Sequence, residues 1–202
     1  CQIAMREIDP AQLSGTVVMV PVMNVPAFEA AQRGNPLDTF SYDMNRIYPG
    51  RANGYLTERM AAVHAAAMVA TADFEISIHS GGAHSFLDKA IFVDESPASV
   101  ELATAMGPGW GCIMSSFNPK GSPMAHMLDT GKVGITVELG GRSATSPTEF
   151  ARVGRELANS ILNILRHYKM YPGTATYPSP RYKGQQEALH ARMEAISDDD
   201  GD

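Results

Sequence analysis

The sequence predicts an α/β fold in which a largely parallel mixed sheet is flanked by helices. Segments with strand character alternate with segments of helical character, and this order is typical of α/β domains. The clearest strand covers residues 74–79, where apolar and polar side chains alternate. A second strand is predicted at 134–139, and a glycine pair follows each of the two strands. Each glycine pair is expected to turn the chain away from the sheet.

The first quarter of the chain is expected to contain one strand and one long loop. Residues 2–8 have the pattern of a helix end, and the β-branched apolar run 16–22 predicts a strand buried on both faces. Pro21 places the end of that strand early or near a sheet edge. Residues 23–56 show no periodicity and are rich in Asn, Gly, Pro, Arg and Asp. A loop of that length inside a compact domain is either disordered or functional, and its arginines favour a functional loop.

Helices and strands alternate in the rest of the chain. Thr57 is predicted to cap an alanine-rich helix that runs to about Thr71, with His64 on its surface rather than bound to a metal. Ser146 and Glu149 form a capping box that opens another helix. A short strand is expected at 90–93 and a helix at 97–105. The apolar stripe predicted for the helix after Ser146 contains Phe150, Val153, Leu157, Ile161, Ile164 and Leu165.

Composition limits the classes of function. A chain of 202 residues with a formal net charge of −6 and no Lys/Arg-rich run argues against nucleic-acid and anionic-membrane partners. Neither a membrane-spanning run nor a secretory signal is visible, and two cysteines make no disulfide framework, so we expect a cytoplasmic protein. We expect one domain at 1–170, with 171–202 as a tail or the start of a truncated C-terminal domain. The chain begins with Cys1 directly inside a helical pattern, and we therefore expect it to be a fragment.

Candidate functional residues follow the strand ends and lie in the long loop. His79 ends one predicted strand and Glu138 lies near the end of another, and ligands bind at the carboxyl ends of strands in open α/β sheets. The loop contributes Asn45, Arg46 and Arg33, and a guanidinium binds a carboxylate through two parallel hydrogen bonds. An isolated histidine is more often a strand cap and an isolated glutamate a solvated side chain. Together these residues suit metal-assisted hydrolysis of a carboxylate-bearing substrate, although one histidine does not make a metal site.

Three motifs resemble those of a known enzyme family. Residues 43–50 read Asp-Met-Asn-Arg-Ile-Tyr-Pro-Gly and resemble the D-x-N-R-x-F/Y-P-G signature of the succinylglutamate desuccinylase/aspartoacylase family. These proteins are zinc-dependent amidohydrolases related to the zinc carboxypeptidases. Residues 77–82 resemble the family's second metal segment, and 137–141 resemble its catalytic-glutamate segment. The resemblance covers roughly residues 2–168, and residues 14–24 are similar to the strand before the family's arginine loop.

The resemblance implies a zinc carboxypeptidase-like fold and a role for each candidate residue. His79 would be a zinc ligand and Glu138 the general base. Arg46 would bind the substrate carboxylate or polarise the scissile carbonyl, with Asn45 beside it and Arg33 as a second anion contact. The implied activity is removal of an acyl group from a small N-acyl amino acid by metal-activated water. Within the family, the bacterial deacetylases of N-acetylated diamino acids look most similar.

Two departures from the family pattern leave alternatives open. Ser77 stands where the family usually has aspartate, and the H-x-x-E segment that supplies the first two zinc ligands does not occur in this chain. We therefore expect the chain alone to be inactive, with that segment upstream of it and the family's β-rich C-terminal domain missing or barely begun after Tyr171. One alternative is a short paralogue without metal that serves as a binding or regulatory domain. Another is a peptide carboxypeptidase, and the oligomeric state stays open, with a homo-oligomer as one option.

Overall fold

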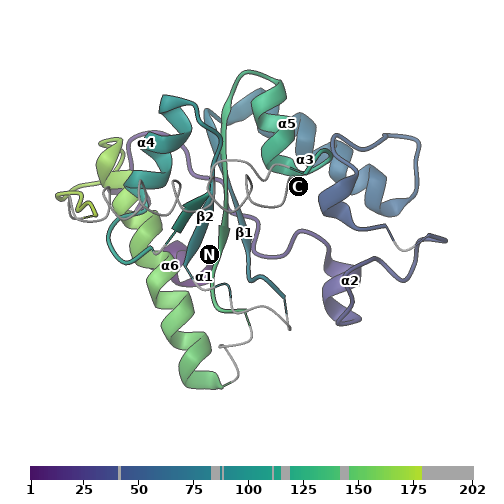
Figure 1. Ribbon diagram of the computed structural model, residues 1–202, viewed down its shortest axis with the longest axis horizontal. Coiled ribbons are helices and arrows are strands. Elements are labelled where there is room, and N and C mark those ends of the chain that lie inside the picture. Colours follow the sequence, from purple (N-terminus) through teal and green to yellow (C-terminus); the bar gives the residue numbers. More distant parts are fainter. Residues whose placement is uncertain are drawn as a thin grey trace, which may run out of the picture.

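A four-stranded mixed sheet forms the centre of the computed structural model (Figure 1), which describes residues 1–40, 42–82, 87, 89–110, 112–114, 119–141 and 146–178. Its order is β1 (Phe74–His79), β4 (Val133–Glu138), β2 (Ala90–Phe92) and β3 (Cys112–Met114). The β1–β4 and β2–β3 pairs are parallel, whereas β2 and β4 are antiparallel. The predicted mixed and largely parallel sheet is confirmed.

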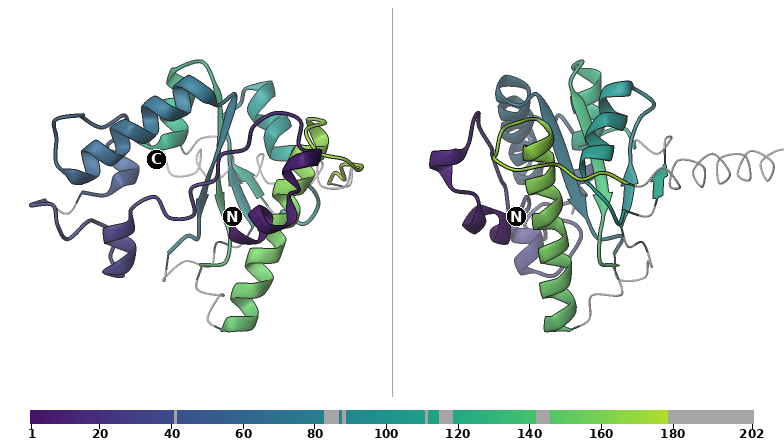
Figure 2. Two further views of the ribbon diagram at one scale, coloured as in Figure 1. Left: turned by 180° about the vertical axis from the view of Figure 1, so that it is seen from behind. Right: turned by 90° about the vertical axis from the view of Figure 1, so that its left-hand side faces the viewer.

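Helices cover both faces of the sheet (Figures 1 and 2). On one face, α4 (Pro97–Ala105) and α6 (Pro147–His167) enclose the main core, and α1 (Gln2–Glu7) packs on the outside of α6. On the other face lie α3 (Leu56–Thr71) and α5 (Pro123–Asp129). The described residues contain no helix of the length and apolar character that a membrane span requires. The fold is thus a three-layer α/β arrangement.

The side chains of β1 divide between these two faces because neighbouring strand residues point in opposite directions. Phe74 and Ile76 pack against the core on the α6 side. Glu75, Ser77 and His79 therefore point to the face that carries α3 and α5. The functional candidates on β1 and the main hydrophobic core are on opposite sides of the sheet.

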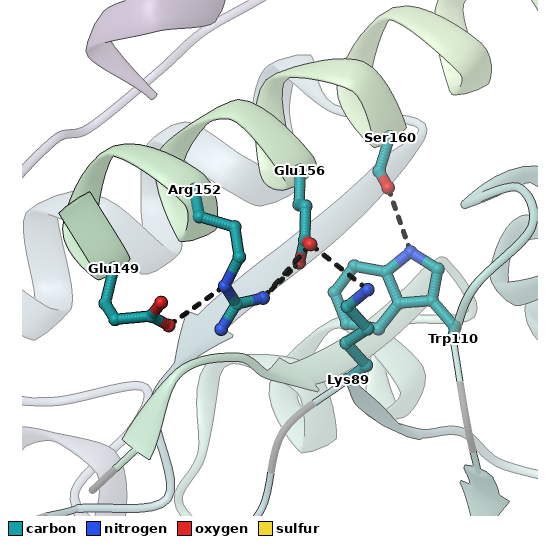
Figure 3. Close-up of polar contacts among 6 residues, drawn as sticks. All are labelled: Lys89, Trp110, Glu149, Arg152, Glu156 and Ser160. Carbon is teal, nitrogen blue, oxygen red and sulfur yellow. Dashed lines mark hydrogen bonds and ion pairs between the residues drawn. The ribbon is translucent and has the colours of Figure 1, made fainter. Parts of the chain in front are cut away.

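The helix α6 is attached to the sheet by polar contacts as well as by its apolar stripe (Figure 3). The Nζ atom of Lys89, just before β2, lies 3.2 Å from an oxygen of Glu156, which also accepts a hydrogen bond of 3.0 Å from Arg152. The indole Nε1 of Trp110 donates to Ser160 at 2.9 Å. These contacts fix α6 over the start of β2, on the face opposite to His79.

Ser146 caps α6 as predicted, since its Oγ accepts a hydrogen bond from the backbone N–H of Glu149 at 3.2 Å. Leu157, Ile164 and Leu165 are buried as predicted, whereas Phe150 is 63% exposed and was wrongly included in the core stripe. Phe150 lies in the first turn, which extends beyond the sheet (Figure 1). The strand near 90–93 and the helix at 97–105 are also confirmed. Residues 179–202 lie outside the described residues.

The strand predicted at 16–22 is wrong. No strand is formed there, and Val18 and Val20 are 74% and 43% exposed. β-branched residues favour a strand only where a neighbouring strand can accept and donate backbone hydrogen bonds. None of the described strands pairs with this segment, so its sequence preference has no partner to act on.

The long loop at 23–56 is not structureless, which corrects the prediction. It contains the short helix α2 (Val25–Glu29) and the 3₁₀ turn η2 (Met44–Arg46), and another 3₁₀ turn, η1 (Pro10–Gln12), precedes it. The Oδ1 atom of Asn24 caps α2 by accepting the N–H of Ala27 at 3.2 Å. Such short helices carry too few residues to show helical periodicity in the sequence.

The cap of α3 also differs from the prediction. Thr57 lies inside the helix, and the cap is the buried side chain of Asp38. Its carboxylate accepts the backbone N–H groups of Leu56 and Thr57, each at 3.0 Å, and the Thr57 hydroxyl also donates to it. Asp38 lies 18 residues before Leu56, and only the tertiary fold brings it to the helix.

Candidate functional site

His79 and Glu138 lie directly opposite each other at the ends of β1 and β4. They are register partners in the parallel pair, and the N–H of Leu139 donates to the carbonyl of His79 at 3.0 Å. Residues opposite each other in a parallel pair point to the same face of the sheet. The structure therefore brings the predicted imidazole and carboxylate together at one edge of the sheet.

The Glu138 carboxylate holds the turn that follows β1. Its Oε2 atom accepts a hydrogen bond from the backbone N–H of Gly81, whose φ of +70° is a left-handed conformation that favours glycine. Partial burial raises the pKa of Glu138, while the Gly81 hydrogen bond and the positive charge of Arg33 act in the opposite direction. This carboxylate of β4 therefore contacts the glycine turn that follows the neighbouring strand β1.

The His79 ring is oriented by Ser77. The Nε2 atom of His79 lies 3.1 Å from Ser77 Oγ, two residues earlier on the same face of β1. Burial lowers the pKa of His79, and the positive charges of Arg33 and Arg46 lower it further, against the opposing effect of Asp43. The ring is therefore neutral at pH 7, which is the form in which an imidazole binds a metal ion.

The long loop before α3 carries an ion pair that the sequence did not reveal. Both Nε and Nη2 of Arg33 lie 2.9 Å from Oδ2 of Asp43. The other oxygen, Oδ1, accepts the N–H of Asn45 at 3.0 Å and so caps η2. Asp43 therefore connects the two predicted substrate residues Arg33 and Asn45.

Arg46 is free of that ion pair. Its Nη1 atom donates to the backbone carbonyl of Asn45 at 2.7 Å, and its side chain is exposed. The carboxylate of the nearby Asp43 is paired with Arg33 instead. Gly121 supports this turn from the other side, since a Cβ atom there would lie only 2.3 Å from the Arg46 carbonyl oxygen.

Asn45 presents an unsatisfied acceptor. Its Oδ1 atom is shielded from solvent and has no hydrogen-bond partner among the described residues. A buried polar atom without a partner costs free energy, so such an atom often marks a place where a ligand donates a hydrogen bond. An amide N–H or an ammonium group would satisfy it.

The residues present fit one position of a zinc site rather than a complete set. Within the described ranges, no group of three or more His, Cys, Asp or Glu side chains converges in a way that could hold a metal. A catalytic zinc requires three protein ligands, and among the described residues His79 is the one imidazole at the strand ends. His126 belongs to α5, with its ring centroid 6.4 Å from that of Tyr48. His84 lies outside the described residues.

A second polar cluster, Tyr48, His64 and Glu75, lies on the same face of the sheet. The hydroxyl of Tyr48 is 2.7 Å from Nδ1 of His64, so His64 is half-buried and engaged rather than a simple surface residue as predicted. The Oε2 atom of Glu75 is shielded from solvent and has no partner among the described residues. Burial raises the pKa of Glu75 to about 8 and, with the charge of Glu75, also raises the pKa of Tyr48.

The raised pKa of Glu75 predicts a stability that falls as the pH rises. Between the ordinary pKa of 4.5 and the folded-state value of about 8, the folded protein binds more protons than the unfolded chain. The free energy of unfolding therefore falls as the pH rises through this range. In Glu75→Gln this part of the pH dependence should vanish. The free energy of unfolding of the variant should therefore rise relative to that of the wild type by up to about 1.4 kcal/mol for each pH unit in that window.

Urea unfolding at intervals from pH 5 to pH 8 measures this difference. The matched control is Glu95→Gln, which removes an exposed carboxylate. If the free energies of unfolding of Glu75→Gln and the wild type change with pH in parallel, Glu75 is solvated in the folded protein.

The catalytic-domain profile of the succinylglutamate desuccinylase/aspartoacylase family matches residues 1–167 of this chain. The chain belongs to this family. A curated relative, the N-alpha-acetyl-L-2,4-diaminobutyric acid deacetylase of Halomonas elongata, is 29% identical over 175 residues, which are 82% of this chain and 48% of the relative. This family member thus spans about half the length of the curated relative it matches.

Solved structures of this family share the fold. The succinylglutamate desuccinylase/aspartoacylase of Rhodobacter sphaeroides is 25% identical with a TM-score of 0.72, and the match covers 89% of this chain and 54% of that one. The product-bound ectoine utilization protein EutE (DoeB) of Ruegeria pomeroyi has the same TM-score of 0.72 at 23% identity, with 89% of this chain and 56% of that one covered. In this member of the family, Ser77 is the residue that contacts the ring of the strand-end His79.

Proposed function

We propose that the protein is a zinc-dependent amidohydrolase that removes an acyl group from an N-acyl amino acid in the cytoplasm. The observation that carries this proposal is the direct opposition of His79 and Glu138 at the strand ends, where the charges of Arg33 and Arg46 reach the His79 ring. Family membership and the deacetylase relative support the reaction class. The relative's substrate favours a small N-acetylated diamino acid over a peptide.

The side chains divide the work of amide hydrolysis between them. Zinc, when bound, would supply an activated water, and His79 is the described residue suited to hold it. Glu138 would accept a proton from the attacking water and return it to the nitrogen of the leaving amine. Gly81 occupies Oε2 of Glu138, which leaves Oε1 to carry that proton.

The loop would bind and orient the substrate. Arg46 would hold the substrate carboxylate through two hydrogen bonds, because its guanidinium is exposed and is not engaged by Asp43. The unpartnered Oδ1 of Asn45 would accept an N–H of the substrate. Bound in this way, the substrate would present its acyl amide to the Glu138 carboxylate.

A binding domain without metal is the second candidate, because the described residues bring one imidazole, and no group of three ligands, to the site. Zinc analysis of the purified protein separates the two. The 202-residue chain should hold far less than one zinc ion per molecule, since its described residues offer too few ligands. If the reading frame before Cys1 encodes an H-x-x-E segment, that longer form should bind about one zinc and release acetate from N-acetyl-2,4-diaminobutyrate.

Two results would change this proposal. A longer form that binds N-acetyl amino acids without zinc and without hydrolysis would identify a binding domain. Tight stoichiometric zinc in the 202-residue chain that is lost in His79→Ala would show that further ligands exist, with His84 and His126 as the first to test.

A further inference from the structure

We propose that His64 is a positioning residue, which fixes the turn that carries Asn45 and Arg46 by binding the hydroxyl group of Tyr48. This inference rests on the proposed function, in which that turn binds the substrate. His64 acts through Tyr48 and touches neither the substrate nor the metal. The contact goes beyond the family's signature, because the signature accepts phenylalanine as well as tyrosine at position 48.

A largely buried hydrogen bond joins Tyr48 of the long loop to His64 of α3. The Tyr48 hydroxyl lies 2.7 Å from Nδ1 of His64, and Tyr48 is 8% exposed. Burial raises the pKa of the Tyr48 hydroxyl and lowers the pKa of the His64 ring. At neutral pH the phenol therefore keeps its proton and the imidazole stays uncharged. The hydroxyl can then donate to Nδ1 without placing a charge in the interior.

The end of the long loop packs closely on α3 at this point. The helix presents the buried small residues Ala61 and Ala65 to the same core cluster that contains Tyr48. A Cβ atom on Gly50, whose φ is +77°, would lie only 2.7 Å from the backbone nitrogen of Ala62. Small side chains allow such a close approach of two backbones. The close approach brings the tyrosine ring within reach of the imidazole one turn along the helix.

Tyr48 in turn fixes the end of the turn that carries Arg46. Tyr48 follows Arg46 by two residues, and its backbone N–H donates to the carbonyl of Gly121 at 2.8 Å. Gly121 also lies directly against the Arg46 carbonyl, where a Cβ atom would not fit. Asp43 fixes the start of the same turn through the N–H of Asn45. The turn is therefore held at both ends, and the His64 contact belongs to the second of these ends.

The helix α3 also leads into the strand that carries the proposed metal ligand. It ends at Thr71, and β1 begins at Phe74 and delivers His79. Glu138 lies opposite His79 on β4. A turn that is bound to α3 is thus held at a fixed position relative to both groups that are proposed for the reaction.

Hydrogen exchange of the 202-residue chain tests whether this contact holds the turn. Tyr48→Phe removes the hydroxyl and keeps the ring, and His64→Ala removes the imidazole. The backbone amides of residues 43–50 should exchange about tenfold faster in either variant. The double variant should exchange no faster than either single one, because both substitutions remove the same bond. The matched control is Val63→Ala at an adjacent exposed position of α3, which should leave the exchange unchanged.

Kinetics of the zinc-loaded, active form test the consequence for the substrate. Both single variants should raise KM for N-acetyl-L-2,4-diaminobutyrate about tenfold and keep kcat within about twofold, because the groups at the strand ends are untouched. Calorimetry should show the same loss in the dissociation constant. His64→Asn keeps an acceptor near the position of Nδ1 and should recover most of the binding. A merely structural role would instead lower the melting temperature and kcat and leave KM unchanged.

Three results would overturn the inference: unchanged hydrogen exchange in both single variants, additive effects in the double variant, or an unaltered KM and dissociation constant. Tyr48→Phe protects the test against a folding defect, since the signature accepts phenylalanine at this position. If the wild type binds the acid without hydrolysing it, the proposed function fails, and tenfold weaker binding in the two variants would still support the inference. Hydrolysis by the wild type with unaltered binding in both variants would do the reverse.

Discussion

Glu138→Gln is expected to lower turnover by roughly 10²–10⁴-fold while the fold and substrate binding persist. Glutamine keeps the shape of the side chain and a carbonyl oxygen that can still accept the Gly81 N–H, but it removes the basic group. Partial burial raises the pKa of Glu138, which makes the carboxylate a stronger base than an exposed one. The substitution is therefore expected to slow the proton transfer and to leave the other steps unchanged.

Steady-state kinetics of the zinc-loaded, active form, with zinc content and circular dichroism as controls, measure this loss. Zinc content and thermal stability should stay close to those of the wild type, and Glu95→Gln should be as active as the wild type. A Glu138→Gln protein that retains most of its turnover, or that loses its fold together with its activity, would assign Glu138 to the support of the Gly81 turn.

Arg46→Lys should have the second largest effect, a fall in kcat/KM of about 10²-fold. Lysine keeps the positive charge but loses the planar fork that binds a carboxylate through two hydrogen bonds. Since Arg46 contacts the backbone of Asn45 and not the Asp43 carboxylate, the loop should hold its structure in the variant. The change should therefore appear in catalysis rather than in stability.

The informative control for Arg46→Lys is Arg51→Lys. Arg51 lies in the same loop but donates to Glu58 at 2.7 Å, so the substitution should leave kcat/KM unaltered. Thermal denaturation of both variants completes the comparison. If Arg46→Lys melts at a lower temperature with full catalytic efficiency, Arg46 is a structural residue of its loop.

Local sequence patterns were sufficient to predict the helices and strands whose ends are marked by neighbouring residues. The alternation in β1, the Ser146 cap of α6 and the strand that delivers Glu138 are all readable within a few residues of sequence. The meeting of His79 and Glu138 followed from one further rule, that parallel strands end at the same edge of a sheet.

What the sequence did not reveal depends on contacts between distant segments. The Asp38 cap of α3, the Asp43 contact with Arg33 and the Tyr48 contact with His64 each join residues that no periodic pattern connects. The segment 16–22 failed for the complementary reason, because its β-branched residues found no neighbouring strand in the described sheet. Pairing partners, unlike caps and alternation, are properties of the whole fold.

The hydrogen bond from Gly81 to Glu138 links the protonation of Glu138 to the stability of the turn that follows β1. A carboxylate that gains a proton becomes a weaker acceptor, so proton uptake by Glu138 would loosen the turn that follows His79. The turn would tighten again once the proton leaves with the amine. The hydrogen bond from the Gly81 amide would in this way be stronger before the proton transfer than after it.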